Sequence, residues 1–455
     1  MDHSSEKLRD DALRIWHAGV AAVHPAKLIH EAVSVEGNTL WLGEQDIDLT
    51  EIKKIAVVGA GKAGAAMAAA LEEMLGKDVL QNKQVTGWIN VPADCLIPTS
   101  AIHLHAARPP GVNDPTEEGL AGTHEILKIV ESLDSTDLCI CLLSGGGSAL
   151  LPSPIDGLSL TEKCDLIREL SSSGANIKQL NAVRRELSRV KGGGLARQCR
   201  AGRMVTLILS DVLGDDLETI ASGPTVLREP TPDLALQVFD ELKIRDQPIV
   251  QKAIQLLGRE KRASDSSASP PHTVVSNLIL GNNATAVDAA GCEAEKLGYS
   301  HAMISASESE GAVEQVAEQL AKMALSMRST EGPDCLISGG EPSVRLCPAE
   351  ERGLGGRNQQ LALAMLDGVA DWQGICFLSA GTDGEDGPTD AAGGIVDQEI
   401  ADRTRELGLV PKQYLARNDA YHFFEEVDGL LKTGPTQTNV CDLRILIVKR
   451  SSARA

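Results

Sequence analysis

The sequence predicts an α/β protein of two domains with mostly parallel sheets, and three observations lead to this fold class. Apolar segments typical of buried strands alternate with helical patterns along the chain. A length of 455 residues is too great for one ordinary domain. A low-complexity stretch at 261–271, KRASDSSASPP, is the clearest linker. We therefore expect an N-terminal domain over residues 1–262 and a C-terminal domain over residues 272–455.

The first strand-turn-helix unit, KIAVVGAGKAG at 54–64, is the most informative segment of the chain. Its apolar strand leads into a turn in which Gly59, Gly61 and Gly64 let the backbone approach a ligand closely. The helix-forming segment that follows presents free N–H groups and a positive dipole end to this turn. Lys62 adds a full positive charge. The unit predicts a Rossmann-like N-terminal domain that binds phosphate.

The spacing of these glycines also fits the G-x-G-x-x-G fingerprint of nicotinamide dinucleotide sites. That fingerprint requires an acidic residue at the end of the next strand to hold the ribose. The next expected strand, at 85–91, ends in Asn90 and Val91, and Asp78 lies before it. The sequence also lacks the G-x-x-x-x-G-K-[ST] phosphate loop. The segment therefore favours phosphate handling, and a dinucleotide enzyme stays as the alternative.

Four later strand ends are polar and glycine-rich, and ligands of α/β sheets bind beyond the carboxyl ends of strands. The segment 137–151 contains a turn that offers successive N–H groups and two hydroxyls to an anion, formed by Ser144, Gly145, Gly146, Gly147 and Ser148. Asp211 follows the strand within 204–216, Glu341 ends the segment 338–341, and Asp383 and Asp386 follow the strand that begins at 375. Carboxylates at such places suit Mg²⁺ or a hydroxyl proton, and some serve only as helix caps.

Two groups of basic residues are candidates for anion binding. Asn181, Arg184, Ser188 and Lys191 are three or four residues apart, so a helix over 177–189 would present them as one polar stripe, which also suits a solvated face. Arg357 and Asn358 stand between the flexible G-L-G-G segment and the start of a helix.

Composition limits the class of protein. The net charge is −21, which argues against nucleic acid or an anionic membrane as a partner. The ten cysteines show no C-x-x-C pair and indicate core residues in a reducing compartment. The N-terminal segment has helical spacing interrupted by acidic residues, and no apolar run approaches the length of a membrane span. We expect a cytoplasmic protein, and the sequence leaves a homo-oligomer open.

Seven segments, in one order and over nearly the whole chain, resemble the glycerate kinases that phosphorylate the 2-hydroxyl and whose C-terminal part is called the MOFRL domain. The segments are VVGAGKAG, LLSGGGSALL, LNAVRRELSRVKGGGLA, LILSDVLGDDLETIASGPT, LISGGEPSV, GLGGRNQQLALA and SAGTDGEDGPTDAAGG. The resemblance implies ATP- and Mg²⁺-dependent conversion of D-glycerate to 2-phosphoglycerate, with the active site in a cleft between two α/β domains.

The resemblance also implies roles for particular residues. It places the catalytic lysine on Lys62, the catalytic arginine on Arg357 and a catalytic aspartate on Asp211. We expect phosphate to lie against the glycine turns, substrate or supporting contacts from Asn181, Arg184, Lys191, Glu341 and Asn358, and a metal near Asp383 and Asp386. Two departures stand out: Arg108 replaces a histidine of the family, and Gly194 replaces an arginine.

Two other functions remain open at this point. One is an NAD(P)H-dependent hydroxypyruvate reductase, which the glycine fingerprint supports and the missing ribose acid opposes. The other is a non-catalytic regulator that binds a sugar acid or nucleotide. The number of separate strand-end loops with chemically capable groups argues against simple binding.

Overall fold

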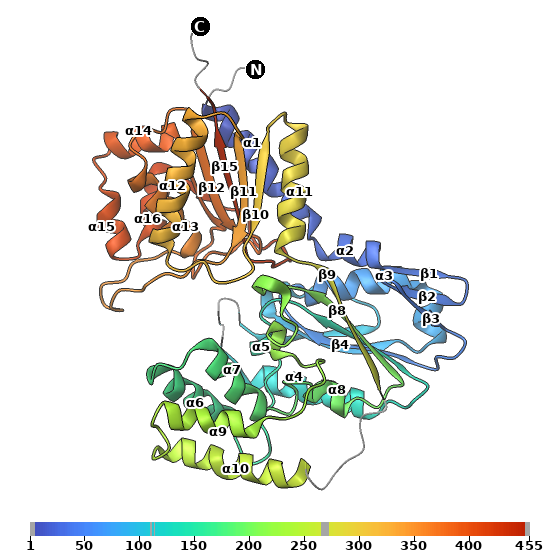
Figure 1. Cartoon of the computed structure of the whole chain (residues 1–455). Helices are drawn as coiled ribbons and strands as arrows, with labels where there is room; N and C mark the ends of the chain where they lie inside the picture. Colours follow the sequence, from blue (N-terminus) through green and yellow to red (C-terminus); the bar gives the residue numbers. More distant parts are fainter. Residues whose placement is uncertain (1–4, 110–111, 113, 265–272, 451–455) are drawn as a thin grey trace. The chain divides into compact units, whose positions relative to one another are not determined.

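The computed structural model describes residues 5–109, 112, 114–264 and 273–450. By its contacts the chain divides into two compact units (Figure 1). The N-terminal unit comprises Pro25–Ser210 and Asp216–Leu280. The C-terminal unit comprises Met1–His24, Asp211–Asp215 and Gly281–Ala455. Each unit has a six-stranded sheet with helices packed on it, so the prediction of two α/β domains is confirmed.

The contact-based division differs from the expected boundary in the 261–271 linker. Residues 261–264 belong to the end of a helix, and 265–272 lie outside the described residues. The strand after the linker still joins the N-terminal sheet, so the units divide at 280/281. The first 24 residues and the segment Asp211–Asp215 also belong to the C-terminal unit, because packing rather than chain order decides membership.

The N-terminal sheet has the strand order β6-β5-β4-β7-β8-β9. In chain order this is 3-2-1-4-5-6, the doubly wound order of dinucleotide-binding folds. The neighbours from β6 to β8 pair in parallel, so a Rossmann-like, parallel sheet is confirmed here. Every residue of β4 and β7 is buried, which explains their unbroken apolar sequences. The strands are β4 (Ile55–Ala60), β5 (Thr86–Pro92), β6 (Ile102–Arg108), β7 (Leu138–Leu143), β8 (Arg203–Leu209) and β9 (Val274–Gly281).

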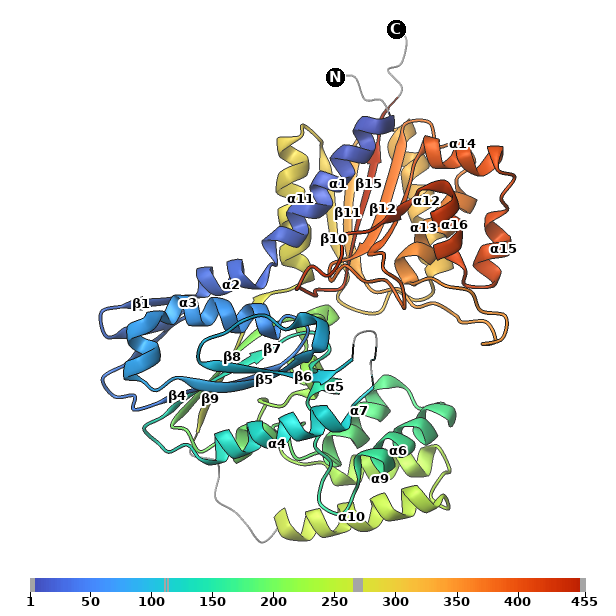
Figure 2. The same cartoon turned by 180° about the vertical axis from the view of Figure 1, so that it is seen from behind.

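Helices of the N-terminal unit flank this sheet or form a separate cluster below it in Figures 1 and 2. The helical cluster consists of α6, α7, α9 and α10 around a core that includes Leu166, Val183 and Phe239. Side-chain capping boxes at Ser159 and Asn176 start α6 and α7. The helices of this unit are α2 (Pro25–Ala32), α3 (Gly64–Asn82), α4 (Glu117–Glu131), α5 (Gly147–Leu150), α6 (Leu160–Ser172), α7 (Ile177–Glu186), α8 (Gly194–Gln198), α9 (Pro232–Glu241) and α10 (Pro248–Ser264).

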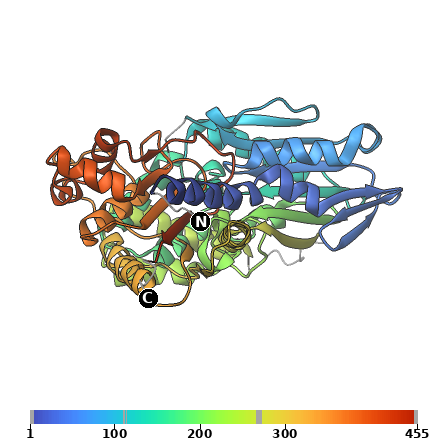
Figure 3. The same ribbon diagram turned by 90° about the horizontal axis from the view of Figure 1, so that it is seen from above.

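A small antiparallel sheet precedes β4 and was not expected from the sequence. Its strands are β1 (Val33–Glu36), β2 (Thr39–Leu42) and β3 (Gln45–Asp48). It lies beside α3 at one end of the unit, in blue in Figure 3.

The C-terminal sheet is mixed, which differs from the expectation of mostly parallel strands in both halves. Its order is β10-β11-β15-β12-β13-β14. β10, β11 and β12 point the same way, but the last strand, β15, enters antiparallel between β11 and β12. The strands are β10 (His301–Ser305), β11 (Cys335–Gly340), β12 (Ile375–Gly381), β13 (Gly393–Val396), β14 (Leu430–Leu431) and β15 (Asp442–Val448).

Helices cover both faces of this sheet. α1 and α11 pack on one face, and α12, α13 and α16 pack on the other (Figures 1 and 2). The helices are α1 (Ser5–Ala22), α11 (Asn283–Lys296), α12 (Val313–Ser329), α13 (Arg357–Gly368), α14 (Gln398–Glu406), α15 (Pro411–Ala416) and α16 (Ala420–Val427). Alternate residues of β15 face the two helical layers, as the strand period of two requires.

The first helix belongs to this unit because its apolar face is buried there. Trp16 is fully buried in the core that α1 shares with α11 and β15. A Cβ on Gly19 would lie 2.5 Å from a methyl of Leu443 and 2.8 Å from the backbone carbonyl oxygen of Ala286, so this close approach of α1 to α11 favours glycine. Arg9 pairs with Asp397 at 2.7 Å, and Asp11 accepts a hydrogen bond from the Tyr299 hydroxyl at 2.7 Å.

All ten cysteines are free thiols, and most are buried, as the sequence indicated. Among the described residues, no helix is both long and apolar enough to cross a bilayer.

Candidate active site

The turn of residues 59–64, here called the Lys62 turn, packs directly against the turn of residues 144–148. The second turn, here called the serine-glycine turn, follows the neighbouring strand. The backbone N–H of Lys62 donates to the carbonyl of Gly145 at 2.8 Å, and that of Ala63 donates to Ser144 Oγ at 3.0 Å. β4 and β7 are parallel neighbours, so both turns leave the same carboxyl edge of the sheet. The structure therefore brings together the two phosphate-binding segments that the sequence predicted.

The three fingerprint glycines are required by neighbouring protein atoms. A Cβ on Gly59 would lie 2.0 Å from the carbonyl oxygen of Leu142, and one on Gly61 would lie 2.0 Å from Ser144 Oγ. A Cβ on Gly64 would lie 2.9 Å from the Ile89 side chain, at the contact between α3 and β5. Close packing of strand, turn and helix thus explains these glycines without a bound dinucleotide.

Gly146 is different, because its conformation is special and its surroundings are open. Its φ is +78°, in the left-handed region, at the start of α5. A Cβ there would lie 3.5 Å from Arg108 Nη2 and 3.7 Å from Lys62 Cγ. Arg108, the departure from the family pattern, thus places a second cation beside Gly146 and Lys62. The surface around Gly146 is suited to an anion.

Ser222 links this region to the following loops, and sequence reasoning missed it. Its hydroxyl lies 3.0 Å from that of Ser148, and its carbonyl accepts a hydrogen bond from Gly192 N–H at 2.9 Å. Ala221 and Ser222 both have left-handed φ values, +49° and +64°. Such backbone strain costs about 1–3 kcal/mol per residue and clusters at functional sites. In the sequence, residues 221–224 (A-S-G-P) stood out only as part of the longer segment LILSDVLGDDLETIASGPT, and nothing marked Ser222 by itself.

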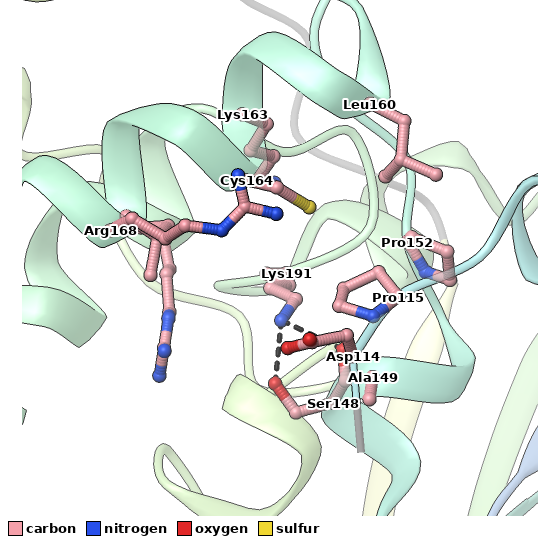
Figure 4. A pocket seen from close by; sticks show the side chains of 12 residues that line it. Asp114, Pro115, Ser148, Ala149, Pro152, Leu160, Lys163, Cys164, Arg168 and Lys191 are labelled. Carbon is pink, nitrogen blue, oxygen red and sulfur yellow. Dashed lines mark hydrogen bonds between the residues drawn. The ribbon is translucent and has the colours of Figure 1, made fainter. Parts of the chain in front are cut away.

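Lys191 reaches the serine-glycine turn from another direction than expected. α7 ends at Glu186, so Ser188 and Lys191 lie beyond it, and the predicted helical stripe from Asn181 to Lys191 is wrong at its second half. The Lys191 amino group donates to Ser148 Oγ at 2.6 Å and to the Ser148 carbonyl at 3.0 Å (Figure 4). Two residues beyond the end of the helix, Ser188 forms an antiparallel β-bridge with Pro154, a backbone pairing that is incompatible with a continued helix.

A pocket of about 260 Å³ opens next to this lysine (Figure 4). Lys163 of α6, Arg184 of α7 and Lys191 line it together with Ser148. Burial and the charge of Arg184 lower the pKa of Lys163 to about 7. Burial, with the charges of Lys163 and Arg184, lowers the pKa of Lys191 well below its ordinary value. Asn181 is buried behind Arg184, 3.5 Å from its guanidinium. Nothing in the sequence marked Lys163 as a site residue, since it is one of several charged residues on an amphipathic helix.

In the C-terminal unit, Arg357 starts α13 and forms two ion pairs. Its Nε and Nη2 donate to the two carboxylate oxygens of Asp442 at 2.8 and 2.9 Å, and its Nη1 donates to Glu341 at 2.7 Å. Burial alone would lower the pKa of Arg357, but Asp442 and then Glu341 raise it above its ordinary value. Asp442 is fully buried, and its role was missed because it is the first residue of an apolar strand.

Asp211 lies near this ion-pair group within the same unit. Its carbonyl accepts from the thiol of Cys441 at 2.9 Å, and Asn439 Nδ2 stands 3.5 Å from its carboxylate. Cys441 directly precedes Asp442 in the chain, so Asp211 and Arg357 border one end of β15. The structure thus places two of the three expected catalytic residues in one region of the C-terminal unit.

The two aspartates expected to bind metal have other partners. The buried carboxylate of Asp386 accepts from the backbone N–H of Asn358 at 3.0 Å and of Gln359 at 2.8 Å. This geometry favours a cap of α13 over a metal ligand. Asp383 accepts from Glu385 N–H at 3.2 Å. Within the described residues, no group of three or more His, Cys, Asp or Glu side chains is arranged to hold a metal ion.

Comparisons with known proteins agree with this arrangement. A family model described as a domain of unknown function, DUF4147, matches residues 11–257, and the model of the MOFRL family matches residues 334–442. A glycerate kinase from Homo sapiens is 35% identical over 510 aligned positions, with 98% of this chain and 94% of the relative covered. This chain belongs to the glycerate kinase family.

Further members show the same extent of similarity. A D-glycerate 2-kinase from Thermotoga maritima is 35% identical, with 97% of this chain and 99% of the relative covered. A crystal structure of a glycerate kinase from the same organism superposes with a TM-score of 0.80 at 33% identity, with 98% of this chain and 100% of that chain covered.

One relative carries a different name. A protein from Agrobacterium vitis, provisionally named a hydroxypyruvate reductase, is 36% identical, with 86% of this chain and 98% of the relative covered. In the present structure Asn90 lies near the end of β5, opposite the last residue of β4, in the region where a dinucleotide fold places its ribose acid. Asn90 is fully buried, and its amide donates to the carbonyls of Leu150 at 2.8 Å and Gly119 at 3.2 Å. Its carbonyl oxygen accepts from Trp88 Nε1–H at 3.2 Å. Both ends of the Asn90 amide thus bond to protein groups and do not face a ribose.

Proposed function

We propose that this protein is an ATP-dependent kinase that transfers the γ-phosphoryl group to the 2-hydroxyl of D-glycerate and forms 2-phosphoglycerate. The observation that supports this most is the contact between the Lys62 turn and the Ser144–Ser148 turn at one edge of the N-terminal sheet. Family membership supports the reaction class, and the name of one relative specifies the 2-hydroxyl.

Phosphoryl transfer depends on positioning and on neutralising the charge of the transferred group. Lys62 and the N–H groups of Gly145 and Gly146 would hold the phosphates, since they meet where the two turns contact. Gly147 was also expected to bind phosphate, but its N–H donates to the carbonyl of Ser144 at 3.1 Å, so it supports the turn. Ser144 fixes the turn by accepting from Ala63 N–H. Gly59, Gly61 and Gly64 act through packing, because each is in close contact with protein atoms.

Arg357 and Asp211 would contribute from the C-terminal unit. Arg357 is held rigidly by Asp442 and Glu341, so its remaining N–H groups have a fixed direction for contact with the transferring phosphoryl group. Asp211 would orient the acceptor hydroxyl or take its proton. Asn358 supports the start of α13, since its Oδ1 accepts from Ser379 at 2.6 Å. That Lys62 of one unit and Arg357 of the other serve one reaction remains a prediction from the resemblance.

Magnesium would enter with the nucleotide. Mg²⁺ commonly keeps several waters and binds through one or two carboxylates plus substrate phosphates. The described residues contain no group of three or more acidic, histidine or cysteine side chains arranged to hold a metal ion. Asp211, Asp383 and Glu341 are exposed or half-buried carboxylates, and one or two of them could bind Mg²⁺ together with the nucleotide phosphates. A bound Mg²⁺ would neutralise phosphate charge in the transition state.

The partners that fit are small molecules, D-glycerate and ATP. The charge of −21 supports the expectation that nucleic acid is not a partner, and a cytoplasmic location and the oligomeric state remain predictions.

The deciding experiment is a coupled assay of ADP release with D-glycerate, followed by identification of the phosphoglycerate isomer. We expect activity that EDTA removes and Mg²⁺ restores, and 2-phosphoglycerate as the product. A parallel assay with hydroxypyruvate and NADH tests the reductase. Oxidation of NADH at enzymatic rates without ADP release would overturn the proposal, and 3-phosphoglycerate as the product would overturn the assignment of the 2-hydroxyl.

A further inference from the structure

The pocket beside Lys191 is formed entirely by the N-terminal unit. Its walls come from the helical cluster, through α6 and α7, and from the start of α5. Figure 4 shows the Lys191 amino group between Ser148 and the residues of α6. Ser148 is the last residue of the serine-glycine turn, and Gly146 of that turn borders Lys62. The pocket therefore adjoins the predicted phosphate site through one short turn.

The pocket contains two buried lysines that no carboxylate of the described residues pairs with. Lys163 and Lys191 are only 8% and 6% exposed. An ammonium has three N–H donors, but among the described residues Lys163 donates to one acceptor, the carbonyl of Leu187, and Lys191 donates to two, both on Ser148. In the same part of the chain neither lysine has a carboxylate partner. A buried lysine without an acidic partner is costly to protonate, and a bound anion would remove that cost, so this arrangement suits an anionic ligand.

Two further cations and one acid complete the charged lining. Arg184 is half-buried, and among the described residues its side chain forms one hydrogen bond, to Asn181 at a long 3.5 Å. Arg168 is mostly exposed and pairs with Asp165 at 2.5 Å. Asp114 lines the pocket without forming an ion pair to these groups in the described residues. With the two lysines protonated, the balance of charge in the lining is positive.

Arg357 has the opposite balance. Asp442 and Glu341 both bind it, so the carboxylates outnumber the guanidinium, and Asp386 lies near enough to act on it as well. The carboxylate of a substrate would meet net negative charge there, whereas the transferring phosphoryl group would arrive with Mg²⁺, which offsets that charge. The carboxylate of a hydroxy acid is therefore better matched by the pocket of the N-terminal unit than by Arg357.

The size and walls of the pocket select a small ligand. Its volume of about 260 Å³ is below the range of roughly 300–1,000 Å³ for sites of drug-sized molecules, which favours a ligand smaller than a nucleotide. Pro115, Pro152 and Ile167 give the lining an apolar part that suits a short carbon chain.

We propose that Lys163, Arg184 and Lys191 bind the carboxylate of the three-carbon hydroxy acid, which directs its hydroxyl toward Gly146 and Lys62. This assignment rests on the proposed kinase function. It makes Lys163 a substrate-binding residue and assigns the carboxylate to this pocket instead of to Arg357.

The test compares Lys163→Met and Arg184→Met with Lys178→Met, an exposed lysine of α7 outside the pocket. We expect the KM for D-glycerate to rise about 10- to 100-fold in the two pocket variants, with the KM for ATP nearly unchanged, because each loses one charged hydrogen-bond donor. Lys178→Met should behave as wild type. Glycerol, which lacks the carboxylate, should be a poor acceptor for the wild type, and the pocket variants should lose most of this discrimination.

Binding of D-glycerate without ATP, measured by calorimetry, separates this proposal from the kinase proposal. If the wild type binds D-glycerate and Lys163→Met does not, the pocket assignment holds even where no phosphoryl transfer is found. A rise in the KM for ATP alone would show that the pocket takes a phosphate and would overturn the assignment. Loss of D-glycerate binding in Arg357→Ala but not in Arg184→Met would overturn it too. Arg184 is half-buried, so its variant keeps the test valid if Lys163→Met does not fold.

Discussion

Arg357 and Asp442 form a two-pronged ion pair at one end of β15, with N–O distances of 2.8 and 2.9 Å. Asp442 is fully buried, whereas the Arg357 side chain is 35% exposed. The arginine therefore has two roles that a single substitution cannot separate: it compensates a buried charge and it faces solvent at the start of α13.

A double variant separates the two roles. Arg357→Met should abolish turnover and also lower stability, because it leaves the Asp442 carboxylate unpaired. Breaking a buried pair costs about 3–5 kcal/mol, which is an upper limit here because the guanidinium is partly solvated. The variant Arg357→Met with Asp442→Asn should regain most of the stability without regaining activity. Thermal unfolding and ADP release measure the two effects, and recovered turnover in the double variant would contradict a catalytic role.

Lys62 should affect turnover with little effect on folding. Lys62 is half-buried, and its backbone N–H donates to the carbonyl of Gly145. A substitution that removes only the side chain keeps this backbone contact. We expect Lys62→Ala to lower kcat by about 10²- to 10³-fold, as for loss of one group that stabilises developing charge. Far-UV circular dichroism and the Tm should stay near wild type. Lys54→Ala, an exposed lysine just before β4, is the matched control. Normal turnover in Lys62→Ala would remove this lysine from the mechanism.

These two residues also show what the sequence can predict. The strand-turn-helix around Lys62 was predictable because local rules fix it: an apolar parallel strand, glycines and a strong helix former. The partner of Arg357 was not, because Asp442 lies in an apolar strand 85 residues away and only the antiparallel entry of β15 brings it to α13. Lys191 was predicted as part of a helix, and its true contact with Ser148 depends on a loop that ends the helix early. Periodicity describes single elements, and these sites depend on how elements meet.

Gly146 tests the functional value of the serine-glycine turn. Gly146→Ala forces a side chain into the left-handed region, at a cost of about 1–2 kcal/mol, and puts a methyl beside Lys62 and Arg108. Gly174, just after α6, has a similar φ of +86° and open surroundings. Both variants should lose similar stability in denaturant unfolding, but only Gly146→Ala should lower kcat/KM for ATP, by about 10²-fold. Equal activities of the two variants would mean that the turn has only a structural role.

Lys163 should make stability depend on pH in a defined direction. Its pKa is about 7 in the folded protein and 10.5 by ordinary value, so between these values the unfolded chain binds one more proton at this residue. Stability therefore rises with pH across this window, by at most about 1.4 kcal/mol per pH unit, and below pH 7 the contribution is constant. The titratable and charged groups around it are Cys164 and Arg168 of α6, Arg184 of α7, Lys191 and Asp114.

Lys163→Met removes this contribution and also the charge that lowers the pKa of Lys191, and both changes alter the pH dependence of stability in the same direction. The variant lacks the buried charge, so its Tm should exceed that of the wild type most at and below about pH 7, and the difference should shrink as the pH rises toward about 10. D-glycerate should stabilise the wild type more at neutral than at alkaline pH, since the anion favours the protonated lysine. Lys178→Met, which changes an exposed lysine, should keep a constant difference from wild type at every pH. A difference between Lys163→Met and wild type that does not change with pH would show that Lys163 keeps its ordinary pKa, and that the charge of the pocket is compensated by a group other than a bound anion.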